Sequence, residues 1–409
     1  MTGAKVLYVS GSLGLGHVTR DLAVARELRR RAPSLQIAWL SASPTLEVLA
    51  ASGETLVPEC SEYLCETDAA DALGTGGTLS LTNYVYRALG KWIHNARVIG
   101  RAAHRGAFDL VVGDETYEVV VAHLLGIRVL SAVPFVMLCD FWGMDVTTGR
   151  FWERLGAWGL NLIWSRQHRL TGQKGNAALF IGEPSDIPNR RFGALLPNRR
   201  ENAENHAGFI GYILPFERQT LPSKDVLRRE LGYGPEPLVI CTVGGTAVGR
   251  ELLELCGQAY PFALARLPAL QMVLVGGPRI DPAGIAAPAG VTKRGMVEAL
   301  YRHLAAADLV VTQGGGTTTL ELTALRVPFL FFPVKAQAEQ EVTIADRIAR
   351  HQAGKRMSTD RTTPLQLAQA IVENIGKSSS AAVIPVDGAA RAAEIILEKL
   401  AAVPPVTSR

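Results

Sequence analysis

The chain repeats one local pattern, an apolar run followed by glycines and then by a helical pattern, near the start of each half. The first copy spans Val6–Leu28 and the second spans Leu238–Tyr260. Short apolar runs of this kind are typical of parallel strands buried on both faces, and the glycines permit the tight turn into a helix. Strand-like and helix-like segments alternate along the rest of the chain, which predicts an α/β protein with parallel sheets.

Two Rossmann-like, doubly wound domains facing a central cleft fit this repetition better than one large sheet. The chain has 409 residues, 48% of them hydrophobic, which is enough for two domains with cores of their own. We expect the first domain over residues 1–214 and the second over residues 215–385, because prolines punctuate the segment at this boundary. A final apolar helix within residues 386–409 is expected to pack back on the first domain.

The positions of the strands follow from the short apolar runs and their flanking glycines and prolines. In the first half, strands are predicted at Val6–Ser10, Gln36–Leu40, Asp109–Gly113 and Arg128–Val133. In the second half, they are predicted at Leu238–Val243, Leu270–Gly276, Asp308–Thr312 and Phe329–Pro333.

Composition excludes several classes of function. The net charge is only +4 and the basic residues are scattered, so nucleic-acid binding is not expected. Five cysteines, an odd number in a long chain, indicate reduced thiols in a cytoplasmic protein. The first strand starts almost at once and no apolar run approaches about 20 residues, so neither a signal peptide nor a transmembrane helix is expected. A peripheral contact with the inner face of the membrane stays open, as does the choice between monomer and homodimer.

The stretch Thr312-Gln-Gly-Gly-Gly-Thr-Thr-Thr-Leu-Glu321 predicts a site for a diphosphate. It follows an apolar strand and opens a helix, whose free N–H groups and dipole favour an anion. The threonines add side-chain donors, and Glu321, one turn into the helix, can accept hydrogen bonds from sugar hydroxyls. The alternative is a glycine-rich turn with a threonine cap.

The loop Gly11-Ser-Leu-Gly-Leu-Gly-His17 also follows a strand, but it is neither the dinucleotide fingerprint nor a P-loop. An NAD enzyme and a P-loop ATPase are therefore not expected. His17 at the helix start is a candidate base that takes a proton from a hydroxyl. Asp114 ends another predicted strand at the same sheet edge, where it can orient a histidine. Glu115 remains a second candidate for this part, and a capping histidine beside a solvated loop is the structural alternative.

Several motifs, in order along most of the chain, resemble the signature of GT-B glycosyltransferases, in particular the UDP-glucosyl/glucuronosyl transferases and the MurG type. The glycine–threonine stretch ends in Val327-Pro328, and Phe331-Phe-Pro333 is followed by Glu339-Gln340. The first glycine loop with His17, the loop Gly244-Gly-Thr246 and the segment Lys293-Arg-Gly-Met296 match further parts of the same pattern.

The resemblance implies a role for each matching residue. His17 would deprotonate the acceptor and Asp114 would orient it, while Glu321 would bind ribose hydroxyls and Met296 would pack on the base. Glu339 and Gln340 would meet the donor sugar. The resemblance and the loop arguments together give the candidate donor-binding residues Gly16, Gly245, Thr246, Arg250, Met296, Gln313, Gly315, Gly316, Thr317, Thr318, Glu321, Glu339 and Gln340.

Three positions depart from the pattern of these families. Gln313 stands where many relatives have histidine, so it can donate a hydrogen bond but adds no charge. Arg326 stands where glycine is usual, which we interpret as a harmless surface change. The carboxylate–glutamine pair is Glu339-Gln340 rather than Asp-Gln, which can alter the choice of sugar.

The function predicted is transfer of a sugar from a UDP or dTDP sugar to a hydroxyl of a small-molecule or lipid acceptor. No Asp-x-Asp triplet occurs in the sequence, so no metal and no cofactor is expected, and one-step attack would invert the anomeric carbon. Closure of a hinge between the domains is the expected gate. Two alternatives share the fold, a nucleotide-sugar 2-epimerase and a non-catalytic partner subunit that binds nucleotide sugar.

The acceptor site is predicted in the aromatic-rich segment 134–170, which holds four of the six tryptophans. Phe141 and Trp142 are candidate contacts for an apolar acceptor. Asp140 and Asp145 are candidates for binding acceptor hydroxyls, or for the base if His17 does not act as one. Acceptor, lipid surface and protein core all remain open as partners of this segment.

Overall fold

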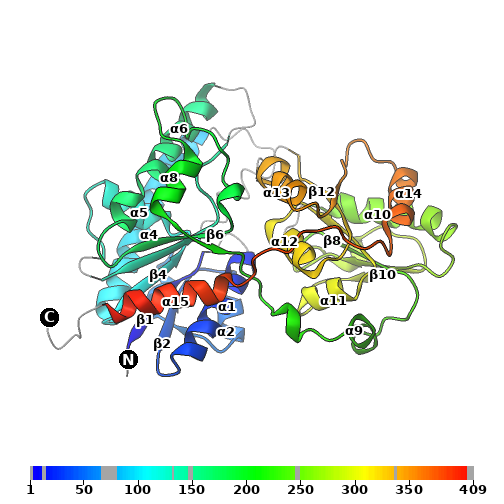
Figure 1. The fold of residues 1–409 in the computed structure, drawn as a ribbon, viewed down its shortest axis with the longest axis horizontal. Coiled ribbons are helices and arrows are strands. Elements are labelled where there is room, and N and C mark those ends of the chain that lie inside the picture. Colours follow the sequence, from blue (N-terminus) through cyan, green and yellow to red (C-terminus); the bar gives the residue numbers. More distant parts are fainter. Residues whose placement is uncertain are drawn as a thin grey trace. The chain divides into compact units, whose positions relative to one another are not determined.

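The computed structural model describes residues 3–11, 15–65, 81–130, 133–145, 151–244, 249–335 and 339–402. The chain divides into two compact units (Figure 1), one of Met1–Pro215 with Pro385–Arg409 and one of Phe216–Ile384. The candidate residues Gly245 and Thr246 lie outside the described residues.

The first unit is built on a parallel sheet whose described strands number seven, in the order β3-β2-β1-β4-β5-β6-β7. Because β2 and β4 lie on opposite sides of β1, the sheet is doubly wound. Its strands are β1 (Lys5–Val9), β2 (Gln36–Leu40), β3 (Thr55–Leu56), β4 (Leu110–Asp114), β5 (Phe135–Cys139), β6 (Ala177–Ile181) and β7 (Gly208–Gly211). Its helices are α1 (Leu15–Arg31), α2 (Thr45–Ala51), α4 (Leu81–Arg105), α5 (Tyr117–Leu124), α6 (Phe151–Arg166), α7 (His168–Thr171), α8 (Arg199–His206) and α15 (Gly388–Ala401).

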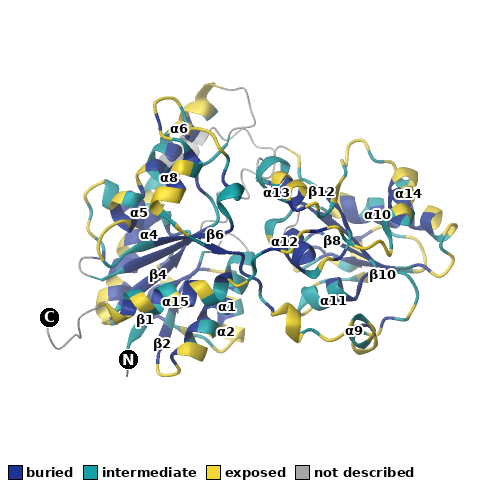
Figure 2. Ribbon diagram, viewed as in Figure 1, coloured by how far each residue is buried: buried dark blue, intermediate teal, exposed yellow. Residues whose placement is uncertain are grey.

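Successive side chains of each strand enter cores on opposite faces of this sheet. From β1, Leu7 and Val9 join the core under α4 and α5, whereas Val6 and Tyr8 join the core under α1 and α15. Figure 2 shows these central strands buried between the two helix layers. The continuous apolar runs noted in the sequence therefore reflect burial on both faces.

The C-terminal helix belongs to the first unit although the second unit precedes it in the chain. Ala392, Ala393 and Ile396 of α15 lie in the same core as Val24 and Leu28 of α1. Burial of this apolar stripe fixes α15 on the outside of the first sheet.

The second unit repeats the architecture with a parallel sheet of six described strands in the order β10-β9-β8-β11-β12-β13. The strands are β8 (Leu238–Thr242), β9 (Gln271–Val275), β10 (Val291–Arg294), β11 (Leu309–Gln313), β12 (Phe329–Phe332) and β13 (Lys355–Arg356). The helices are α9 (Lys224–Leu231), α10 (Arg250–Leu264), α11 (Leu300–Ala306), α12 (Gly316–Leu325), α13 (Ala345–Arg350) and α14 (Pro364–Asn374). A π-helix, Glu339–Ile344, runs directly into α13. The predicted class, two Rossmann-like α/β units, is confirmed.

One predicted strand is wrong. Residues 128–130 are not in a strand, residues 131–132 lie outside the described residues, and β5 begins at Phe135. All five residues of β5 are buried and pair with β4 and β6. The valines at 129 and 133 favour a strand by propensity, but pairing between two buried neighbours selected the apolar run after Pro134 instead.

Candidate active site

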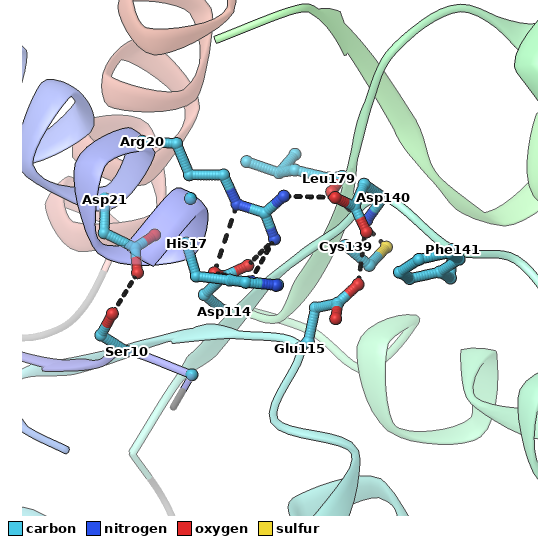
Figure 3. Close-up of polar contacts among 12 residues, drawn as sticks. Ser10, His17, Arg20, Asp21, Asp114, Glu115, Cys139, Asp140, Phe141 and Leu179 are labelled. Carbon is cyan, nitrogen blue, oxygen red and sulfur yellow. Dashed lines mark hydrogen bonds and ion pairs between the residues drawn. The ribbon is translucent and has the colours of Figure 1, made fainter. Parts of the chain in front are cut away.

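Three acidic or basic side chains meet at the carboxyl edge of the first sheet. His17 lies in the first turn of α1, Asp114 ends β4, and Asp140 directly follows β5. Because β1, β4 and β5 are parallel neighbours, their carboxyl ends bring these residues to one place (Figure 3).

His17 and Asp114 are in direct contact, as their predicted pairing requires. Nδ1 of His17 lies 2.8 Å from Oδ2 of Asp114. The aspartate side chain is fully buried, whereas the imidazole keeps 17% of its surface exposed. A histidine held by a buried carboxylate, with part of its ring open to solvent, has the arrangement of a general base and its orienting group.

Arg20 completes this cluster, and the sequence analysis missed it. Its Nε donates to Oδ2 of Asp114 at 3.2 Å and its Nη2 donates to Oδ1 at 2.5 Å, while Nη1 pairs with Asp140. Arg20 follows His17 by three residues, so both side chains project from the same face of α1. That spacing was a signal in the sequence, but only the register of β4 and β5 shows which carboxylates the guanidinium meets.

The carboxyl groups around Arg20 differ in the direction in which their pKa values are shifted. Burial raises the pKa of Asp114 and of Asp140, but the Arg20 guanidinium, helped by His17, more than offsets this, and both pKa values lie below the usual range. Burial and the neighbouring Asp140 hold the pKa of Glu115 well above its usual range. At neutral pH, Asp114 and Asp140 are therefore ionised, whereas Glu115 holds its proton more tightly than an ordinary glutamate does.

Glu115 is held in an uncommon backbone conformation next to this cluster. Its φ is 51°, in the left-handed region, and its Oε1 accepts from the backbone N–H of Asp140 at 3.4 Å. Non-glycine residues adopt this conformation mainly where the surrounding structure imposes it, often at functional sites. Oδ1 of Asp140 is buried and has no hydrogen-bond partner by geometry among the described residues.

A second buried carboxyl, Asp21, anchors α1 to the sheet beneath the site. It accepts from Tyr8 Oη at 3.0 Å and from Ser10 Oγ at 2.5 Å. Burial, together with the nearby Asp114, raises its pKa well above the usual range. No pattern in the sequence indicated this contact, because Asp21 looks like an ordinary residue of an amphipathic helix.

The predicted acceptor contacts differ in exposure. Asp140 keeps 32% of its side chain exposed, and Phe141 is half-buried, its carbonyl accepting from Tyr117 Oη at 3.1 Å. Trp142, in contrast, is buried in the core and donates its Nε1–H to Asn202 Oδ1 at 3.1 Å. Asp140 and Phe141 therefore present surface to a ligand, and the indole of Trp142 packs inward.

In the second unit, the carboxyl ends of β8, β11 and β12 lie at one edge of the sheet, because these strands are parallel neighbours. Gln313, the last residue of β11, is buried against Gly249 at the start of α10. Gly249 has a φ of 135°, and a Cβ atom there would come within 2.5 Å of Gln313 Nε2. Gln313 therefore packs directly under the start of α10, and only glycine fits this approach.

The start of α12 has the features of an anion site. Gly315 is the N-cap, and the next helical residues are Gly316, Thr317 and Thr318. No side chain among the described residues caps the helix, so its first N–H groups remain available to a ligand. Thr319 Oγ1 instead donates back to the Gly315 carbonyl at 2.8 Å, which ties down the turn.

Glu321 is a buried carboxyl one turn further along α12. No hydrogen bond or ion pair links it to another described residue, and burial alone raises its pKa to about 8. Glu321 therefore has hydrogen-bonding capacity that no other described residue uses.

Glu339 and Gln340 also lie beside this helix start. A Cβ atom at Gly316 would be 3.8 Å from Glu339 Oε1, and one at Gly314 would be 3.2 Å from Gln340 Oε1. Gln340 accepts from the backbone N–H of Val334 at 3.0 Å. A residue that the sequence analysis missed, Arg347 of α13, donates to the Gly316 carbonyl at 2.9 Å.

The remaining candidates are exposed or half-buried. Arg250 is exposed and donates to the Gly284 carbonyl. Met296 is 67% exposed in the loop after β10, and Gly16 is half-buried in the first turn of α1. Their predicted contacts with a donor stay predictions.

Comparison with known proteins places these features in a known class. Residues 294–391, which include the start of α12, match the glycosyltransferase family 28 C-terminal domain. An uncharacterized glycosyltransferase of Methanopyrus kandleri is 27% identical over 190 residues, 46% of this chain and 53% of that protein. The chain thus spans about half the length of this relative.

Two further matches extend over almost the whole chain. The UDP-N-acetylglucosamine--N-acetylmuramyl-(pentapeptide) pyrophosphoryl-undecaprenol N-acetylglucosamine transferase of Clavibacter sepedonicus is 26% identical over 416 residues, 98% of each protein. Among solved structures, the glycotransferase of kitacinnamycin shares the fold with a TM-score of 0.62 and 18% identity, covering 98% of this chain and all of that one.

The protein thus has the GT-B fold, and its residues 294–391 match the glycosyltransferase family 28 C-terminal domain. The resemblance predicted from the motifs is confirmed. The class of enzyme predicted from the sequence, a glycosyltransferase, is the class of the matching family and relatives. Within the described residues, no helix is long and apolar enough to cross a membrane.

Proposed function

We propose that the protein transfers a sugar from a nucleoside-diphosphate sugar to an acceptor hydroxyl, with inversion and without a metal ion. The observation that carries this proposal is the 2.8 Å contact between His17 Nδ1 and the buried Asp114. It leaves the second ring nitrogen, Nε2, available as a base. The family match and the helix start of α12 support the donor half of the proposal.

In the proposed reaction, His17 Nε2 takes the proton of the acceptor hydroxyl. The acceptor oxygen bonds to the anomeric carbon as the bond from that carbon to the diphosphate oxygen breaks. The electron pair of the broken bond leaves with the diphosphate, and the proton stays on His17. Asp114, ionised at neutral pH, stabilises the imidazolium that forms.

The donor half of the proposal uses the second unit. Backbone N–H groups at the start of α12 would stabilise the departing diphosphate. Glu321 would accept hydrogen bonds from ribose hydroxyls, and Glu339 with Gln340 would contact the sugar. The Clavibacter relative is by name a transferase of UDP-N-acetylglucosamine, which supports testing UDP donors first.

The acceptor is proposed to be a small molecule or a lipid with an apolar part. Phe151, Trp152, Leu155 and Trp158 are exposed on α6, and the sequence analysis placed the acceptor in this segment. Exposed apolar patches of this kind are typical of ligand-binding or membrane-binding surfaces.

Calorimetric titration tests the donor half. UDP, dTDP, GDP, ADP and NAD are titrated into the full chain, each with and without EDTA. We expect micromolar binding of one pyrimidine diphosphate, unchanged by EDTA, followed by transfer from the corresponding nucleotide sugar. Binding of NAD alone, or of no diphosphate, would refute the proposal. Metal-dependent binding would refute its metal-free part.

A further inference from the structure

Arg20 contacts His17, Asp114 and Asp140 in the first site. In Figure 3 its Nη1 points toward Asp140, and its Nη2 points toward Asp114 and His17. The side chain is only 12% exposed, so water does little to weaken these contacts. The guanidinium is therefore fixed by two carboxylates, one on each of two neighbouring strands.

The Nδ1 atom of His17 has two polar neighbours with opposite requirements. Asp114 Oδ2 lies at 2.8 Å and Arg20 Nη2 lies at 2.9 Å. An ionised carboxylate only accepts a hydrogen bond and a guanidinium only donates one. A ring nitrogen either carries a hydrogen or offers a lone pair, so Nδ1 can satisfy only one of the two.

The two choices have opposite consequences for the base. If Nδ1–H donates to Asp114, the lone pair of Nε2 is free to take a proton. If Nδ1 accepts from Arg20, the hydrogen moves to Nε2, and neutral His17 then has no lone pair there. The position of the Arg20 guanidinium thus decides whether His17 is competent.

We propose that Arg20 is a positioning residue that selects the tautomer of His17, and that its ion pair with Asp140 keeps it from taking the Nδ1 lone pair. The inference rests on the proposed function, in which His17 is the base. Asp140 then acts through Arg20, which differs from the acceptor contact predicted from the sequence.

The charges around His17 support this assignment. The groups that face it are Arg20 on α1, Asp114 at the end of β4, Asp140 after β5 and, further out, Glu115 and Asp21, whose pKa values burial raises. Arg20 is the one cation among these groups, and it is shared between the two ionised carboxylates, Asp114 and Asp140.

Two substitutions and their combination test the proposal. Asp140→Asn keeps the size of the side chain but removes the charge that restrains Arg20, and Arg20→Gln replaces the competing guanidinium by a shorter, uncharged side chain. Histidine-selective ¹⁵N NMR of the full chain reports the tautomer, and His17→Gln assigns the signals of His17 among the eight histidines. The other histidine signals show whether each variant is folded.

We expect the Nδ1–H tautomer in the wild type, the Nε2–H tautomer in Asp140→Asn, and a return to Nδ1–H in the double variant. The turnover of Asp140→Asn should fall by about 10- to 100-fold, within the contribution of a general base. Adding Arg20→Gln should recover part of that loss, because the two substitutions act through one contact. The matched control is Glu62→Gln, which breaks the exposed Arg101–Glu62 pair of the same unit and should change neither readout.

Two results would overturn the inference. An unchanged tautomer in Asp140→Asn would show that Arg20 does not compete for Nδ1. A raised KM for the acceptor that Arg20→Gln does not relieve would show that Asp140 only binds acceptor. The tautomer measurement needs no turnover, so it decides the inference even if the protein transfers no sugar. Sugar transfer without a tautomer change in Asp140→Asn would refute the inference and leave the proposed function standing.

Discussion

The two units present sites of opposite construction. In the first, His17, Arg20, Asp114 and Asp140 satisfy one another through ion pairs. In the second, the start of α12 offers backbone N–H groups and the buried Glu321 has no partner among the described residues. The first, the paired site, holds its charged groups in ion pairs within the protein, whereas the second, the open site, leaves hydrogen-bonding capacity unused.

The difference follows from what each site has to do in the proposed reaction. A base must hold one orientation and one charge state before the acceptor arrives, which fixed ion pairs provide. A site for a diphosphate and a ribose must leave donors and acceptors open for the ligand to fill. The pKa shifts of one carboxyl group in each site reflect this difference. The charged neighbours of Asp114 lower its pKa, whereas burial without a partner raises the pKa of Glu321 to about 8.

The largest effect is expected from His17→Ala, which removes the proposed base from the paired site of the first unit. Turnover should fall by about 10²- to 10⁴-fold, because general-base catalysis contributes that much. The affinity for the nucleoside diphosphate should stay unchanged, since the open site is in the other unit. Initial rates and calorimetry measure the two quantities. Equal loss of turnover and diphosphate affinity would contradict this separation.

Glu321→Gln should remove a proton linkage from the open site. Ribose hydroxyls that donate to Glu321 favour its ionised form, so binding of UDP at pH 7 should release up to about one proton. Titration in buffers of different ionisation enthalpy measures this release. The variant should bind more weakly and release none, and dTDP, with one ribose hydroxyl fewer, should release less. Equal release by wild type and variant would rule out Glu321 as the ribose ligand.

The same substitution should change how stability depends on pH. Glu321 has a folded pKa of about 8 and an ordinary value of 4.5, so the folded protein binds the extra proton between these limits. The protonated Glu321 therefore contributes on the order of a few kcal/mol to the free energy of unfolding below about pH 4.5. This contribution is lost as pH rises through 8. Urea denaturation at pH 6 and pH 8.5 should show this loss in the wild type and not in the variant.

A smaller effect is expected from Gly249→Ala, which pushes on Gln313 under the open site. The new Cβ would lie 2.5 Å from Gln313 Nε2 at a φ of 135°, so we expect a loss of about 1–3 kcal/mol in stability and weaker UDP binding. Gly232→Ala is the matched control, since Gly232 has a φ of 75° and no atom within 4 Å of an added Cβ. It should cost about 1 kcal/mol and leave UDP affinity intact. Equal UDP affinities in both variants would contradict the role of this contact.

The smallest effect is expected at the other end of α12. Arg326 caps the helix with a φ of 59°, where glycine is favoured. Arg326→Gly should stabilise the second unit by up to about 1 kcal/mol, although it loses a 3.4 Å bond to the Ser379 carbonyl. Thermal denaturation measures the gain. A change in UDP affinity would show that binding depends on more of α12 than its start.

The sequence predicted the features that depend on local pattern. Apolar runs, glycine loops and helical periods are short-range signals, and they were enough to give two Rossmann-like units and the strand-to-helix turns before His17 and at Gly315–Thr318. They also gave Asp114, because the end of a parallel strand is readable from where its apolar run stops. The shift of one strand to Phe135–Cys139 shows the limit, since that choice depended on pairing with β4 and β6.

The contacts that distinguish the two sites needed the tertiary structure. Arg20 and Asp140 are 120 residues apart, and Gln313 and Gly249 lie on different loops. The raised pKa of Glu321 and the lowered pKa of Asp114 come from burial and neighbours, not from residue type. The sequence by itself determined which side chains reach the carboxyl edges of the two sheets. Only the packing of distant segments decided which of them are paired, buried or left open, because charge and solvation depend on neighbours in space rather than along the chain.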